Sequence, residues 1–216
     1  MTDIFHEVDE EVRRERLQKL WERYSIYIIA LAVLIVAGVG AWRGYEWWIG
    51  KQATVAGAQF EQALTLSEQG KHGEAEQAFA KIAADAPSGY RVLARFRAAA
   101  ELSQDKPADA VKAYDELAAD GSLNQTLKDL GAVRAAMLLV DTAPLAEMEK
   151  RLAPLTEPGR TFRASARELL ALSAWHNKDV TAARKYLDMM AADAETPAGA
   201  RARAEVLSAL IAGGKS

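Results

Sequence analysis

The sequence of 216 residues contains no cysteine. This absence excludes disulfide bonds, zinc sites built on thiolates and catalysis by a cysteine nucleophile. A chain without cysteine is compatible with an oxidising compartment. Thiol chemistry therefore has no part in the function of this chain.

Histidine is scarce, and His6, His72 and His176 lie far apart. None stands at the spacing of a metal-ligand motif, so no metal site is predicted, and His72 and His176 are interpreted as exposed turn residues. Basic runs are missing too, because 27 Lys and Arg are interspersed with 30 Asp and Glu, for a formal net charge of −3. We therefore expect no nucleic-acid partner.

The sequence motifs of common enzyme classes are also missing. The sequence contains no G-x-S-x-G, no glycine-rich phosphate loop ahead of a lysine and no dinucleotide fingerprint. Paired acids such as Glu74 and Glu76 fall on amphipathic helices, where they are interpreted as part of the solvated face. The sequence predicts no catalytic residue, no cofactor and no enzyme activity.

Apolar residues make up half of the chain. The main contributor to this apolar fraction is alanine, not the β-branched and aromatic residues that strands favour. The composition therefore predicts an all-α fold.

A run from Ile26 to Trp42 contains no charged residue. At a rise of ~1.5 Å per residue it is about 25 Å long, which is just enough to span a bilayer. A buried core helix and a cleavable signal peptide, with Val39-Gly40-Ala41 as its cleavage site, are the alternatives. The sequence favours an uncleaved transmembrane helix over residues 26–49, preceded by an amphipathic tail over residues 1–25.

Aromatic residues flank this run on both sides, as expected where a helix crosses the lipid headgroups. The predicted membrane-interface residues are Trp21, Tyr24, Trp42, Tyr45, Trp47 and Trp48.

Lysine and arginine are distributed unevenly around the predicted span. Five of them precede it and two closely follow it, at Arg13, Arg14, Arg16, Lys19 and Arg23, and at Arg43 and Lys51. The positive-inside rule then predicts a cytoplasmic N-terminus. In a Gram-negative bacterium, the domain after residue 50 is periplasmic and the chain is a single-pass inner-membrane protein.

A repeated pattern follows the span. In the first copy an alanine, an aromatic residue and an aliphatic residue stand at i, i+4 and i+7, and a proline follows at i+12. Copies recur 35 residues later and 72 residues after that, consistent with a period near 34. The predicted repeat positions are Ala75, Phe79, Ile82 and Pro87, then Ala110, Tyr114 and Leu117, then Ala182, Tyr186 and Met189.

This spacing resembles the second helix of a tetratricopeptide repeat (TPR). A weaker unit at Leu145, Met148 and Leu152 occupies the remaining period. First helices are expected near residues 51–69, 89–103, 123–140 and 160–176, and a capping helix from Thr196-Pro197 to Ile211. The prediction is a TPR-like α-solenoid of about four helical hairpins over residues 50–213, a fold that typically holds a peptide, a helix or a protein tail.

The order of these parts resembles the ancillary SecYEG translocon subunits, the YfgM-like family. The likeness is carried by Arg14–Trp21 ahead of the span, by the aromatic exit Trp42–Trp47 and by the repeats. It implies a non-catalytic accessory beside the Sec channel, which contacts exported proteins and periplasmic chaperones. The alternatives are a structural adaptor of another envelope assembly, for division or outer-membrane biogenesis, and a membrane-bound stress-signalling regulator.

Overall fold

The computed structural model describes the backbone of residues 3–214 and the side chains of residues 21–87 and 89–214. Every regular element in that range is helical, which confirms the all-α prediction for the described residues. Contacts divide the chain into two units, Met1–Thr54 and Val55–Ser216.

The first unit is formed by the N-terminal part of α1 (Asp3–Glu68). From Trp21 onward this helix is long and apolar enough to cross a membrane, and none of its most apolar window is buried within the chain. A core helix would instead be covered by its neighbours. Most side chains of the amphipathic pattern predicted for residues 1–25 precede Trp21 and lie outside the described side chains, as does the side chain of His6.

The helix expected over residues 51–69 is not a separate element. It is the last part of α1, which continues to Glu68. The expected boundary lay where apolar patterning gives way to amphipathic patterning. No proline occurs in this stretch, and a change of patterning does not interrupt the backbone hydrogen bonds of a helix.

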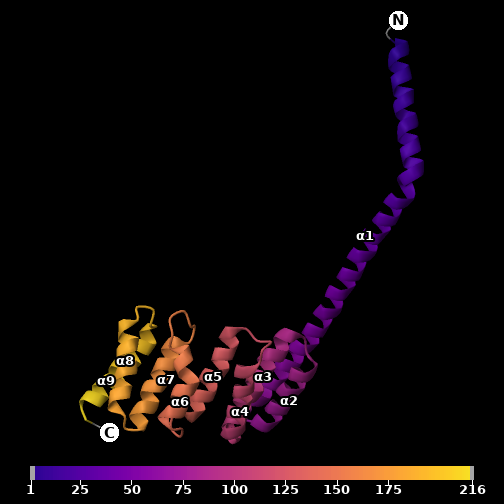
Figure 1. Ribbon diagram of the computed structural model, residues 1–216. Coiled ribbons are helices and arrows are strands. Elements are labelled where there is room, and N and C mark those ends of the chain that lie inside the picture. The colour runs from indigo at the N-terminus through magenta and orange to yellow at the C-terminus, as the bar shows by residue number, and fades with distance from the viewer. Residues whose placement is uncertain (1–2, 215–216) are drawn as a thin grey trace. The chain divides into compact units, whose positions relative to one another are not determined.

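The second unit consists of helical hairpins that follow one another along the chain (Figure 1). The part of α1 from Val55 pairs with α2, α3 pairs with α4, α5 with α6, and α7 with α8; α9 follows alone. The bounds are α2 (His72–Asp85), α3 (Ser88–Asp105), α4 (Pro107–Ala119), α5 (Gln125–Leu139), α6 (Leu145–Leu152), the 3-10 helix η1 (Ala153–Leu155), α7 (Arg163–His176), α8 (Val180–Ala192) and α9 (Ala198–Ala212).

Proline and short polar side chains mark where these helices begin. Pro87, Pro144 and Pro197 each stand immediately before a helix. Proline fits there because its fixed φ suits the first turn and its missing N–H is not needed. Asn124 and Asp179 cap α5 and α8 by accepting a hydrogen bond of 2.9 Å from a backbone N–H three residues on.

Alanine fills the contacts between helices. The fully buried alanines include one or more on each of several successive helices, so neighbouring backbones approach closely. Large apolar side chains fill the space beside them. The alanines are Ala63, Ala75, Ala94, Ala99, Ala110, Ala135, Ala136, Ala166, Ala171, Ala174 and Ala183, and the largest fully buried apolar side chains are Phe79, Leu117, Met148, Leu152, Leu170 and Met190.

In the first two copies of the repeated pattern, the predicted positions are buried. They are Ala75, Phe79 and Ile82 on α2, and Ala110, Tyr114 and Leu117 on α4. Pro87 follows α2 and stands directly before α3.

The third copy lies one residue further along than expected. Ala182 and Met189 are only partly buried, whereas Ala183, Leu187 and Met190 are buried at the spacing i, i+4 and i+7. The aromatic Tyr186 set the expected register. It is buried beside that face, and its hydroxyl donates a 2.7 Å hydrogen bond to Glu149 on α6.

The weak unit also lies further along than expected, by three residues. Met148, Leu152 and Leu155 are buried at i, i+4 and i+7, so Met148 rather than Leu145 takes the first position. Methionine there replaces the small residue of the other copies. The pattern was weak in the sequence because a large side chain occupies the place of alanine.

We expect Gly131→Ala to destabilise the repeat domain. A Cβ at Gly131 on α5 would lie 2.9 Å from the Tyr114 carbonyl oxygen and 3.0 Å from the Ala118 amide nitrogen of α4. Both contacts are backbone atoms of a packed helix, so overpacking should cost about 1–2 kcal/mol. Urea unfolding followed by circular dichroism measures the loss.

Gly73→Ala is the matched control, because the same change on α2 meets nothing within 4 Å. Its stability should be unchanged or slightly raised, since alanine favours helix over glycine. Equal unfolding midpoints for both variants would contradict the close approach of α4 and α5.

Candidate partner-binding groove

A groove of about 410 Å³ opens between α7 and α9, with α8 contributing to its floor. Its lining is apolar except for one ion pair. On each long wall the lining side chains recur at helical spacing and share one face. The walls are Glu168, Leu172 and Trp175 on α7, and Arg203, Val206 and Leu210 on α9; Leu187 on α8 and Ala202, Ala204 and Leu207 on α9 complete the lining.

The lining is accessible to solvent. Val206 is 62% exposed and Leu210 is 39% exposed, although both are large and apolar. A polar outer face is the usual property of the last helix in a repeat stack. An apolar groove on such a helix is therefore a candidate surface for a protein partner.

An ion pair joins the two walls at one position. The Arg203 guanidinium donates two hydrogen bonds to the Glu168 carboxylate, at 2.5 and 2.8 Å. The Arg203 side chain is largely exposed, so this pair adds little stability by itself. Its two-point geometry favours one alignment of α9 along α7.

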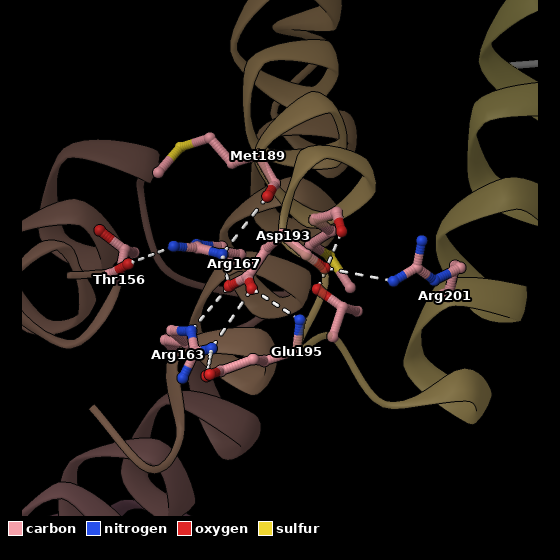
Figure 2. Close-up of polar contacts among 9 residues, drawn as sticks. Thr156, Arg163, Arg167, Met189, Asp193, Glu195 and Arg201 are labelled. Carbon is pink, nitrogen blue, oxygen red and sulfur yellow. Dashed lines mark hydrogen bonds and ion pairs between the residues drawn. The ribbon is translucent and has the colours of Figure 1, made fainter. Parts of the chain in front are cut away.

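A second polar network fixes the loop that leads into α9 (Figure 2). Arg163 and Arg167, one turn apart on α7, donate to the Asp193 carboxylate at 2.6 and 2.7 Å. Arg163 also donates to Glu195, and Arg201 on α9 donates to the Asp193 carbonyl at 3.2 Å. The start of α9 is therefore tied to α7.

Arg167 is the buried member of this network, with 5% of its surface exposed. Besides Asp193, it donates to the carbonyl oxygens of Thr156 and Met189 at 2.7 and 3.3 Å. Burying a guanidinium is unfavourable unless its donors are used and its charge is paired. Asp193 supplies that charge, so the carboxylate and Arg167 depend on each other.

The electrostatics agree with this geometry. The hydrogen bond from Arg163 holds the pKa of Asp193 well below its usual range, and the Glu195 N–H and Arg167 act in the same direction. Asp193 in turn raises the pKa of Arg163. Both groups are charged at neutral pH.

Two further buried carboxylates tie helices together. Glu101 on α3 accepts a 2.7 Å hydrogen bond from the Ser67 hydroxyl and lies 2.8 Å from His72 Nδ1. Asp129 on α5 pairs with Arg160 at 3.2 Å. His72, expected to be an exposed turn residue, begins α2 and is partly buried because its ring contacts Glu101.

The predicted site residues lie apart from the groove. Most of the predicted repeat positions are buried in the core, whereas Pro87, Ala182 and Met189 are only partly buried. Burial raises the pKa of the Tyr114 hydroxyl. The predicted interface aromatics Trp21, Tyr24, Trp42, Tyr45, Trp47 and Trp48 are all exposed. Among the described side chains, no group of three His, Asp or Glu could hold a metal ion.

The groove itself was not predicted from the sequence. Residues 196–211 were expected to form a cap, and α9 does end the described helices. The available signal was Val206 and Leu210, two large apolar residues four apart on a helix expected to have a polar outer face.

A family model for the tetratricopeptide repeat-like domain matches residues 18–170. The chain belongs to the tetratricopeptide repeat-like domain family. Domains of this TPR-like family generally mediate protein–protein interactions and are typically non-catalytic scaffolds. No curated protein and no solved structure matches the chain.

The TPR-like match begins before the apolar segment and therefore includes it. It ends at residue 170, within α7. The rest of α7, with α8 and α9, lies beyond the match, and so does the α9 wall of the groove. The groove is thus built largely from residues that the family model does not cover.

We expect Asp193→Asn to destabilise the chain at neutral pH, because it leaves Arg167 buried without a countercharge. The folded pKa of Asp193 lies below the ordinary value of about 3.9. Its contribution is therefore complete above that pH and is lost as the pH falls toward the folded pKa. Urea unfolding at pH 7 and at pH 3 measures the difference between variant and parent.

The difference should be largest at pH 7 and should shrink below about pH 4. Glu195→Gln is the control, because the Glu195 side chain is 78% exposed and should matter little. A difference that is the same at both pH values would contradict a charged role for Asp193.

Proposed function

We propose that this chain is a non-catalytic, membrane-anchored scaffold whose TPR-like domain holds protein partners. The apolar part of α1 crosses the inner membrane of a Gram-negative bacterium as a single span. Residues 1–25 lie in the cytoplasm, and the repeat domain lies in the periplasm. The observation that carries the proposal is a TPR-like family match that includes an apolar helix with no buried residues in its most apolar window.

Three features of the first unit support the anchor. The aromatic side chains at both ends of the apolar segment are exposed, as lipid-interface residues require. Lysine and arginine are more frequent before the segment than after it, which favours a cytoplasmic N-terminus. Lys51 also lies 5.4 Å from the Trp47 ring centroid, a pairing suited to the headgroup level.

The more specific role that we propose is an accessory of the Sec translocon. The span would lie beside the channel, and the repeat domain would contact exported proteins or periplasmic chaperones. Support comes from the resemblance of the anchor and repeats to the ancillary translocon subunits. The exposed apolar groove adds a surface able to hold an apolar segment of another protein.

Site-specific photocrosslinking in native membranes tests this role. One photoreactive residue replaces Trp21, which is exposed beside the span, and another replaces Val206 in the groove. Tyr114 is unsuitable because it is buried. We expect Sec channel subunits at position 21 and exported chains or chaperones at position 206.

A photoreactive residue at Lys112 is the control, because this side chain is exposed on α4 and lies outside the groove. It should give neither product. Recovery of only a cell-wall or outer-membrane assembly at positions 21 and 206 would contradict the translocon role and favour an adaptor of that assembly.

A further inference from the structure

Two basic residues follow the apolar run, at the end of the span where the positive-inside rule makes lysine and arginine less frequent. They are Arg43 and Lys51, and Glu46 is the only other charged residue from Ile26 to Phe60. This part of α1 therefore carries a local net charge of +1. Basic residues at the less favoured end of a span indicate an anionic contact there.

Helical spacing brings Arg43, Trp47 and Lys51 onto one face of α1, because each stands four residues after the one before. The Lys51 ammonium lies 5.4 Å from the centroid of the Trp47 ring, so the indole holds this charge beside it. The Arg43 side chain is 80% exposed and donates a 3.3 Å hydrogen bond to Glu46. A guanidinium and an ammonium each have several donors, more than these contacts use among the described side chains.

A shallow apolar hollow continues the same face toward the middle of the span. Val36, in its lining, stands two helical turns before Arg43, so the hollow and the basic residues are aligned along the helix. Gly40 lies between them and has no side chain to raise the surface. The hollow has a volume of about 410 Å³ and is lined by Ile29, Ala32, Val33, Val36 and Ala37.

The length of this stretch matches one leaflet of a bilayer. From Ala32 to Arg43 the helix rises about 16 Å, at ~1.5 Å per residue, and half of a hydrocarbon core of ~30 Å is about 15 Å. An acyl chain that lies along the hollow thus brings its own phosphate to the level of Arg43 and Lys51. A carboxylate of a soluble protein would match the charges but would leave the hollow uncovered.

We propose that this face binds one phospholipid with an anionic headgroup, its phosphate between Arg43 and Lys51 and one acyl chain along the hollow. The inference rests on the proposed membrane span. Guanidinium and ammonium groups are the usual protein partners of phosphate. The Trp47 ring, apolar with one N–H donor, suits the boundary between headgroup and chain. We name this surface the lipid face; its residues are Ile29, Ala32, Val33, Val36, Ala37, Gly40, Arg43, Trp47 and Lys51.

Native mass spectrometry of the full-length chain, released from detergent micelles, tests the proposal. The micelles contain equal amounts of phosphatidylglycerol, which is anionic, and phosphatidylcholine, which is zwitterionic. We expect phosphatidylglycerol to be retained about 5-fold more, the effect of one net charge at a membrane surface. The preference should shrink as salt is raised. Excess inorganic phosphate should not displace the lipid, because it cannot fill the hollow.

The double variant Arg43→Gln/Lys51→Gln should lose the preference, and Arg43→Lys should keep it. Glu46→Gln should increase the preference, because it removes the opposing charge. Lys71→Gln/Lys81→Gln is the matched control, since it changes the net charge equally on exposed residues of the repeat domain. It should leave lipid retention unchanged.

Two further measurements test the hollow. Gly40→Leu should reduce retention of both lipids, and a Cβ there meets nothing within 4 Å in the described structure, so the helix accommodates the change. A photoreactive residue in place of the exposed Val36 should crosslink to phospholipid in native membranes. A crosslink to protein alone at position 36 would overturn the proposal and assign this face to a partner helix.

The proposal is also overturned if the two lipids are retained equally, if the Arg43/Lys51 double variant keeps the preference, or if inorganic phosphate displaces the lipid. Equal retention with Sec channel subunits recovered at position 21 would reject the lipid face and keep the translocon role. A clear lipid preference without those crosslinks would reject the translocon role and keep the lipid face.

Discussion

Helices of the repeat domain meet through small side chains, and this close approach sets the position of every other contact. Ala75, Ala110 and Ala183 are fully buried at the same position of their hairpins. Gly131 goes further, since even one methyl group there would collide with the backbone of α4. Where Met148 replaces the small residue, the helix is short and continues into a 3-10 turn. Methionine occupies volume that an alanine at this position leaves to the neighbouring backbone.

Close packing also governs the polar residues. A charged side chain enclosed between helices must find a partner, because water cannot reach it. Arg167 pairs with Asp193 and donates to two carbonyl oxygens, and Asp129 pairs with Arg160. These internal pairs fix loops and helix starts.

Much of the fold could be predicted from the sequence because proline, alanine spacing and apolar periodicity act locally. The four hairpins and the last helix follow from these signals. The register of α8 could not be predicted, because Tyr186 and Leu187 both fit the repeated pattern and only their packing against α6 and α7 distinguishes them. The polar network could not be predicted either. Asp193 and Arg167 are far apart in the sequence, and each taken alone is typical of a solvent-exposed residue. The groove depends on where α9 lies against α7, which no local pattern specifies.

The central claim is a repeat domain held on the far side of a membrane by one span. Because the chain has no cysteine, single cysteines provide unambiguous labels. Thr2→Cys and Ser208→Cys variants in right-side-out membrane vesicles would be treated with a maleimide that cannot cross the bilayer. We expect Cys at position 208 to react at once and Cys at position 2 only after the vesicles are opened. Immediate labelling at position 2, or equal labelling at both positions, would contradict the proposed span and its orientation.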